Sequence, residues 1–177
     1  MIRIAENILT GGDIGNVQPT MPSSAIEIRE QQYDPIVGRF YRVKGDYART
    51  SGSQSFQPIG VGAAISFGIL VKGAQPHTIR ADLDNGTAGG VILLKDDIEI
   101  TTDWQWIFTE GATSIEVQDG DKVRVVVYPR NFELHWAKAA AYIGPPSDIW
   151  TPAHADLTPE QIATLPPYGE YKEIKSF

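Results

Sequence analysis

Short strand-like segments, separated by turn residues, fill the middle of this 177-residue chain. Residues 25–30 (AIEIRE) and 78–84 (TIRADLD) alternate apolar and polar side chains, which is typical of half-buried strands. Residues 64–73 and 89–96 are mostly apolar and predict strands that are buried on both faces. Gly, Asp, Asn or Pro bound each segment, at the spacing of about 8–12 residues that favours sandwiches and barrels. We therefore predict an all-β fold, a compact β-barrel or β-sandwich.

Other segments extend this pattern, and two segments favour helix instead. Further strands are predicted at 36–43, 97–103, 104–110, 113–118 and 122–129. Residues 131–144 could form a short helix through their alanine-rich centre, ended by Gly144-Pro145. Residues 157–165 carry a clearer signal, because Thr158 can cap the helix, Pro159 suits the first helical position and Gln161 completes a capping box.

Composition divides the chain into three parts. Residues 1–24 mix Gly, Pro, Ser and Asn with few apolar side chains and predict an extended N-terminal arm. Residues 25–143 form the β domain. Residues 144–177 contain six prolines and predict a second arm that carries the short helix. We expect this arm to lie on a surface, because its four large aromatic side chains are unfavourable in water: Trp150, Tyr168, Tyr171 and Phe177.

Charge and cysteine content exclude several classes of function. The net charge is −7 and the fifteen basic residues are scattered, which argues against a nucleic-acid partner. The chain has no cysteine, so disulfides, zinc–thiolate sites and cysteine nucleophiles are excluded. The apolar run 59–71 is too short to cross a bilayer, and the first residues lack a signal-peptide core. We expect a protein made in the cytoplasm with no membrane partner.

Candidate metal sites are better explained as turns. Asp119-Gly120-Asp121 lacks the later ligands of a calcium loop and has the composition of a β-turn. Residues 81–90 have a similar mismatch, and Asn85-Gly86 is the strongest hairpin signal in the chain. The three histidines, His77, His135 and His154, lie apart from one another and are interpreted as structural. We predict no metal and no cofactor.

No catalytic constellation is recognisable, and the aromatic residues remain as candidates for binding. No serine lies in a G-x-S-x-G elbow, so we predict that the protein is not an enzyme. Trp104 and Trp106 are two residues apart and share one strand face. That face is either an exposed platform for glycans or, as we favour, core or a subunit interface. The candidate partner-interface residues are Trp104, Trp106, Trp136, Trp150, Tyr168, Tyr171 and Phe177.

Three motifs carry a resemblance to a known family. Val37-Gly38-Arg39-Phe40, Gly68-Ile69-Leu70-Val71 and Gly120-Asp121-Lys122-Val123 resemble strand motifs of the cement, or head-decoration, proteins of tailed bacteriophages. The similarity covers about residues 36–127. It implies a β-barrel or sandwich on the capsid surface of the virion, made in the host cytoplasm. The implied partners are the major capsid protein, whose neighbouring subunits the protein would staple together, and further copies of itself as a dimer or trimer.

Two other functions remain open from the sequence. A tail-tube, neck or baseplate subunit of a phage would share the β-rich core and the two arms. A carbohydrate-binding module would use Trp104, Trp106 or Trp136 as its platform. The cement function is the expectation we carry forward, since extended arms add buried area against neighbours and many copies add through multivalency.

Overall fold

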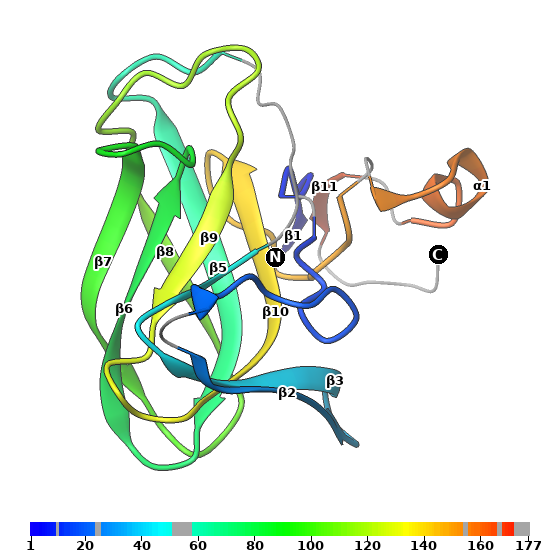
Figure 1. The fold of residues 1–177 in the computed structure, drawn as a ribbon. Coiled ribbons are helices and arrows are strands. Elements are labelled where there is room, and N and C mark those ends of the chain that lie inside the picture. Colours follow the sequence, from blue (N-terminus) through cyan, green and yellow to red (C-terminus); the bar gives the residue numbers. More distant parts are fainter. Residues whose placement is uncertain (10, 24–25, 51–57, 154–155, 166–167, 172–177) are drawn as a thin grey trace.

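Two antiparallel sheets lie face to face and form the body of the protein, as Figure 1 shows. The structure is a computed structural model that describes residues 1–177 apart from 10, 24–25, 51–57, 154–155, 166–167 and 172–177. Nearly all of the regular structure is strand, so the predicted all-β class is confirmed, and the form that it takes is a sandwich. The predicted domain boundary at residue 24 lies outside the described residues.

Strand order defines the two sheets and a small third one. The five-stranded sheet consists of β2 (Ile26–Asp34), β3 (Gly38–Gly45), β10 (Leu134–Ile143), β5 (Ala64–Gly73) and β8 (Gln105–Ala112), in that order. The four-stranded sheet consists of β4 (Ala48–Arg49), β9 (Arg124–Tyr128), β6 (His77–Asp84) and β7 (Val91–Ile100). The third sheet pairs β1 (Ile2–Ile4) with β11 (Gly169–Tyr171), so the first strand lies beside the last.

The core lies between the two large sheets, where alternate residues of each strand point inward. Ile65, Phe67, Ile69 and Val71 line it from β5, and Trp136 lines it from β10. The opposite sheet contributes Ile79, Ala81, Leu83, Ile92, Val125 and Val127. These aliphatic and aromatic side chains exclude water from the interior, and burial of this kind is the main force that stabilises a sandwich.

Residues 131–144 do not form the short helix that their alanines suggested. Leu134–Ile143 is strand β10, which lies at the centre of the five-stranded sheet and pairs with both β3 and β5. Ala139 and Ala141 face the core, while Ala140 is buried on the opposite side of the strand. Because both faces are covered, the strand lacks the apolar–polar alternation that marks a half-buried strand.

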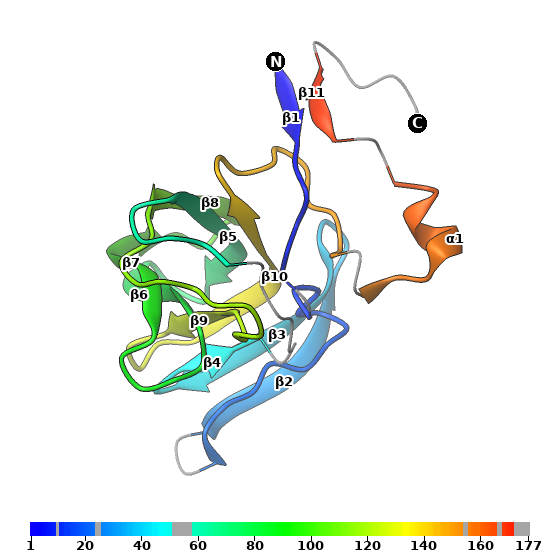
Figure 2. The ribbon, with the colours of Figure 1, turned by 90° about the horizontal axis from the view of Figure 1, so that it is seen from above.

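The terminal segments pack against β10 of the five-stranded sheet, the N-terminal one beside the strand and Trp150 of the C-terminal one against it. The Ile8 amide donates to the Ala141 carbonyl and the Ala139 amide donates to the Gly12 carbonyl, so the N-terminal segment lines the free side of β10 beyond β3. Leu9 and Ile14 of this segment are fully buried. Figure 2 shows the first strand and the C-terminal segment together on this side of the sandwich.

Several local predictions can be compared with the structure. The turn at residues 118–121 forms, with the Asp121 amide donating to the Gln118 carbonyl (3.1 Å) and Gly120 at φ 89°. The helix α1 (Pro159–Ile162) begins with the predicted capping box at Thr158. Residues 97–103 are not a separate strand, because β7 runs through Asp97 (φ 50°) to Ile100.

Candidate functional site

The edge strand β8 presents two aromatic side chains on the outer face of the five-stranded sheet. Trp106 and Phe108, here called the aromatic strip, are each 37% exposed. Their ring centroids are 5.6 Å apart and their planes differ by 1°. Large apolar side chains on an open surface are unfavourable in water, so this parallel pair is a candidate binding surface.

Gly68 explains how Phe108 can lie close to the sheet. Gly68 pairs with Phe108 across β5 and β8, and a Cβ built on Gly68 would lie 2.6 Å from two ring atoms of Phe108. The ring therefore occupies the space that a side chain at Gly68 would fill. Leu70, the cross-strand partner of Trp106, supports the second ring in the neighbouring row.

A second aromatic group continues the strip toward β3. Trp104 contacts Phe40 edge to face, with ring centroids 5.3 Å apart, and Phe40 stacks on His135 at 5.1 Å. The Lys72 ammonium lies 5.1 Å from the centre of the Trp104 ring. Since Lys72 and Leu70 are two residues apart on β5, Trp104 and Trp106 flank the same face, as their spacing predicted.

The charged groups of this face are held in pairs. The Lys72 ammonium lies 3.7 Å from the Asp34 carboxylate, and the Lys138 ammonium lies 2.6 Å from that of Asp13. At the other end of the strip, Glu110 lines a shallow cavity of about 270 Å³ together with Gly111. The face therefore combines exposed apolar rings with paired cations and one acidic end.

The other predicted interface residues lie in different surroundings. Trp136 is fully buried in the core and offers no surface to a partner. The Trp150 indole donates to the Ala139 carbonyl (2.9 Å), and the Lys138 ammonium lies 4.3 Å above its ring. Tyr168 is 40% exposed in the C-terminal segment. Phe177 lies outside the described residues, and only the backbone of Tyr171 is described, in β11.

Phe108 was not among the residues predicted from the sequence. The signal was present, because Trp104, Trp106 and Phe108 follow one another at two-residue steps. Such steps keep side chains on one face of a strand. Which face is exposed depends on the strands that pair with β8, and this information is not local.

Two further questions are whether side chains are grouped to hold a metal ion and whether a helix could cross a membrane. Within the described ranges, no three His, Cys, Asp or Glu side chains are grouped so that they could hold a metal ion. None of the helices in the described part of the chain has the length and apolar character needed to cross a bilayer. His77 and His135 lie apart, against Phe132 and Phe40 respectively.

Comparison with known proteins identifies the fold. No protein-family model and no curated protein matches this sequence. Among solved structures, the second N-terminal cellulose-binding domain of a β-1,4-glucanase from Cellulomonas fimi is similar at 11% identity, with a TM-score of 0.50 over 80% of this chain and 97% of that one. A xylan-binding domain from Paenibacillus barcinonensis is similar at 7% identity, with a TM-score of 0.48 over 82% and 100%. The likeness to the Cellulomonas domain shows a common β-sandwich fold.

Proposed function

We propose that this protein is a non-catalytic carbohydrate-binding module that binds a polysaccharide chain along the aromatic strip. The observation that carries the proposal is the parallel, half-exposed pair Trp106 and Phe108 on an open sheet face. The fold that the chain shares with a cellulose-binding domain supports it. Carbohydrate binding, which was one alternative from the sequence, thereby becomes our first choice.

The chemistry of the strip suits a sugar chain. A sugar ring presents C–H groups on its faces and hydroxyl groups around its edge, so its faces stack on aromatic rings while its edge needs polar partners. Trp106 and Phe108 would receive the ring faces, and the Glu110 carboxylate, at the end of the strip, would accept hydrogen bonds from hydroxyl groups. The strip lies on the edge strand of its sheet.

The test compares binding by the wild type and by single variants. Isothermal titration calorimetry with soluble xylan, mixed-linkage β-glucan and hydroxyethylcellulose gives affinities for each. We expect Trp106→Ala to weaken binding by about thirtyfold, the effect of removing a central aromatic anchor of roughly 2 kcal/mol. Its fold should persist with a modest fall in the thermal unfolding midpoint, because the ring is only partly buried.

A matched control separates site-specific loss from a general effect. Tyr33, at the end of β2, is 73% exposed and far along the sheet order from β8. Tyr33→Ala should therefore bind as the wild type does. Equal losses in Tyr33→Ala and Trp106→Ala, or no binding of any of the polysaccharides by the wild type, would reject the proposal.

The cement function stays a prediction, and one feature favours it as the second candidate. Strand β8 is an edge of its sheet, and an exposed edge with aromatic side chains can also pair with a strand of a protein partner. Size-exclusion chromatography with light scattering, before and after mixing with expanded phage capsids, tests this. Comigration with capsids would support it, and separate elution would oppose it.

A further inference from the structure

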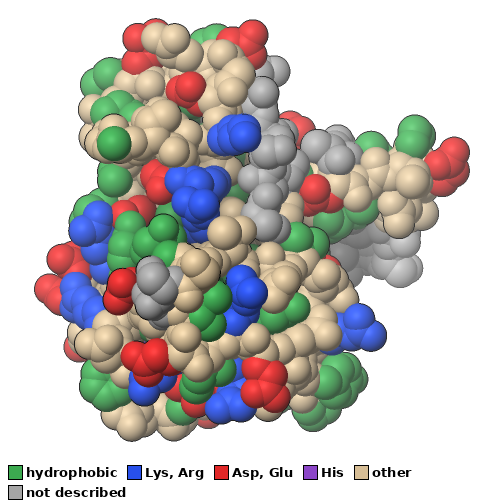
Figure 3. All heavy atoms as spheres, viewed as in Figure 1, with side chains coloured by type: hydrophobic (Ala, Val, Ile, Leu, Met, Phe, Trp, Pro, Cys, Tyr) green, Lys and Arg blue, Asp and Glu red, His purple; other side chains and the backbone are tan. Residues whose placement is uncertain are grey.

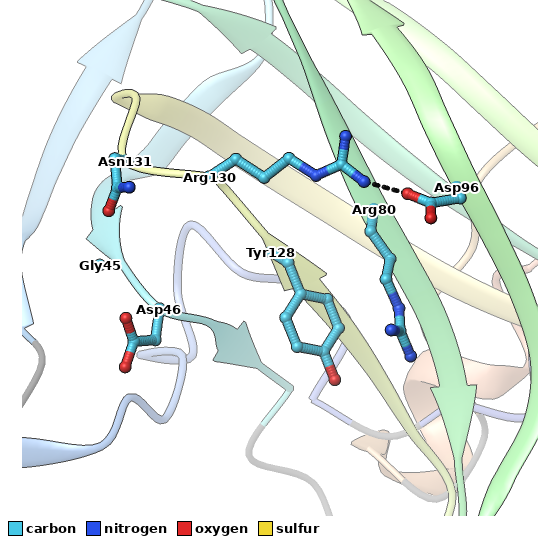
Figure 4. Close-up of a pocket in the computed structure, with 7 residues that line it drawn as sticks. All are labelled: Gly45, Asp46, Arg80, Asp96, Tyr128, Arg130 and Asn131. Carbon is cyan, nitrogen blue, oxygen red and sulfur yellow. Dashed lines mark hydrogen bonds and ion pairs between the residues drawn. The ribbon is translucent and has the colours of Figure 1, made fainter.

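A polar cavity of about 360 Å³ opens on the outer side of the four-stranded sheet, on the face opposite to the aromatic strip. Figure 4 shows its lining, which comes from four separate segments of the chain. The lining residues are Gly45, Asp46, Arg80, Asp96, Tyr128, Arg130 and Asn131. The volume lies at the lower end of the range of about 300–1,000 Å³ that is usual for small-molecule sites.

The floor of the cavity is held in place by a buried carboxylate. Asp82, which is fully buried, accepts hydrogen bonds from Arg80 Nε (2.9 Å) and Arg80 Nη2 (2.8 Å). The Arg80 guanidinium lies 4.9 Å from the centre of the Tyr128 ring, and the two side chains extend side by side in Figure 4. Asp82 accepts from Nε and from one N–H of Nη2, so the second N–H of Nη2 and both of Nη1 can serve a ligand.

Tyr128 keeps its hydroxyl proton over the whole physiological range. Burial raises the pKa of the Tyr128 phenol above its usual value, and the nearby Asp82 carboxylate raises it further. A neutral phenol both donates and accepts a hydrogen bond. The Asp82 carboxylate already accepts the Tyr128 hydroxyl proton, so Tyr128 is left to accept a hydrogen bond from a ligand.

The rim of the cavity is built on unusual backbone. Arg130 (φ 56°) and Asn131 (φ 66°) lie in the left-handed region, and Asp97 (φ 50°) follows the lining residue Asp96. Among the described residues other than glycine, only these three have positive φ. Arg130 and Asn131 are the central residues of a type I′ turn between β9 and β10, which the Phe132 amide closes by donating to the Pro129 carbonyl (3.3 Å). From this turn Arg130 reaches the carboxylates of Asp96 and Asp97.

The charges of the cavity indicate the ligand. Two guanidinium groups, of Arg80 and Arg130, face the carboxylates of four acidic residues: Asp46, Asp82, Asp96 and Asp97. The net charge is negative, so an anion is disfavoured, and the guanidinium groups disfavour a cation. The polar lining also disfavours an apolar ligand. Closely spaced donors and acceptors suit a neutral ligand with many hydroxyl groups, each of which donates and accepts.

Figure 3 shows this face from outside. Lys and Arg side chains lie over the four-stranded sheet, with Asp, Glu and hydrophobic side chains among them. The face differs from that of the aromatic strip, and it has a cavity where the strip has an open surface. A cavity of this size takes one sugar ring, such as the end of a chain, whereas the strip takes a run of rings.

We propose that the cavity lined by Asp46, Arg80, Tyr128 and Asn131 is a second carbohydrate site, which binds a single neutral sugar ring. It does not depend on the aromatic strip, because the two sites share no residue. Asp46 is exposed on the open side of the cavity, opposite Arg80, and would accept hydrogen bonds from the ring hydroxyls. Asn131 would supply both a donor and an acceptor beside it.

Nitrogen–proton correlation spectra of the full chain test the proposal directly. Titration with glucose, xylose, galactose and mannose should shift the amide signals of Gly45, Asp46, Tyr128 and Asn131 for at least one sugar. Titration with glucuronate should give weaker shifts, because its carboxylate meets a net negative site. Stronger binding of glucuronate, or no shift at these four residues with any neutral sugar, would overturn the proposal.

Three variants localise the effect. Asp46→Ala should weaken monosaccharide binding at least tenfold, and its fold should persist because this side chain is exposed. Asp119→Ala removes an equally exposed carboxylate from a distant turn and should leave binding unchanged. Trp106→Ala should also leave monosaccharide binding at the cavity unchanged while it weakens polysaccharide binding. If Trp106→Ala lost both monosaccharide and polysaccharide binding while Asp46→Ala lost neither, all binding would belong to the strip. That result would reject the second site.

Discussion

The two outer faces of the sandwich differ in the side chains that they expose to water. The four-stranded sheet turns polar side chains outward and pairs them within the sheet, as Arg80 does with Asp82 and Arg124 does with Asp84. The five-stranded sheet turns both paired charges, such as Lys72 and Lys138, and apolar rings outward, and Trp150 of the C-terminal segment lies against part of it. On its edge strand β8, Trp106 and Phe108 remain partly in contact with water.

This difference indicates which face can give a large ligand the more favourable binding free energy. Paired charges on the four-stranded sheet already have their partners, so a ligand there must replace existing interactions. The aromatic strip has no such partners to lose, and burial of apolar area contributes roughly 25 cal/mol for each Å². A large ligand is therefore expected on the five-stranded sheet, and only a small, hydroxyl-rich one on the other.

The largest effect is expected where the terminal segments are fastened to the five-stranded sheet. Buried Asn7 donates to the Thr151 carbonyl (2.8 Å) and accepts from the amides of Leu9 (3.0 Å) and Ala141 (3.1 Å). Asn7→Leu would leave these three backbone groups without partners inside the protein. We expect a loss of about 3 kcal/mol in the free energy of unfolding, measured by urea denaturation.

Asn16→Leu is the matched control for this change. Asn16 lies in the same segment but is exposed, so its replacement should change stability by less than about 0.5 kcal/mol. Limited proteolysis should release the N-terminal segment faster in Asn7→Leu than in the control. Equal cleavage rates in the two variants would show that Asn7 does not hold the N-terminal segment in place.

An intermediate effect on stability is expected when acid protonates Glu133, which lies just before β10. Hydrogen bonds from Arg42, at 2.6 and 3.0 Å, and from His135 hold the pKa of Glu133 at about 2, against a usual 4.5. Because the folded pKa is the lower one, this stabilisation is complete above pH 4.5 and disappears as the pH falls toward about 2. The Glu133 side chain is only 20% exposed, so solvent screens the pair weakly.

Glu133→Gln measures this contribution. The variant should be less stable than the wild type by about 1–3 kcal/mol at pH 7, since a charged hydrogen bond is lost. The gap should close as the pH approaches 2. Urea unfolding at several pH values gives the difference directly, and a gap that stays constant between pH 7 and pH 2 would contradict the assignment.

The smallest effect is expected under the strip itself. Gly68→Ala places a methyl group where the Phe108 ring now lies, so the ring must lift from the sheet. We expect a stability loss of about 1 kcal/mol and weaker polysaccharide binding, both from the displaced ring. Gly60→Ala, where a Cβ meets no atom within 4 Å, is the control. Unchanged binding in Gly68→Ala would mean that the position of the ring does not matter.

Local sequence patterns were enough to predict the class of fold. They were not enough to predict which strand faces are exposed. Strands β5 and β6 were recognisable from apolar runs and alternation, and the α1 cap from Thr158 and Gln161. Each of these signals lies within a few residues of the chain. Strand β10 was not recognisable, since it is covered on both faces by segments distant in sequence, among them the N-terminal residues.

The tryptophans show the same limit. Trp136 is buried and Trp106 is half exposed, although both lie in strand-like surroundings. Their difference depends on strand register, because Trp136 pairs with inward-facing Val71 and Trp106 pairs with Leu70 on the outer side. The polar cavity could not be predicted either, since Arg80 of β6, Tyr128 of β9 and Asp46 of the β3–β4 connection meet only in the folded sandwich.

The docking of the first residues against the last strands has a consequence for synthesis. Ile8 and Gly12 bond to β10, and Asn7 bonds to Thr151, so the N-terminal segment finds its place only after residue 151 has left the ribosome. Until then its apolar side chains have no cover, and nascent chains with exposed apolar surface tend to associate. We therefore expect the N-terminal segment to remain undocked until β10 and Thr151 have been made.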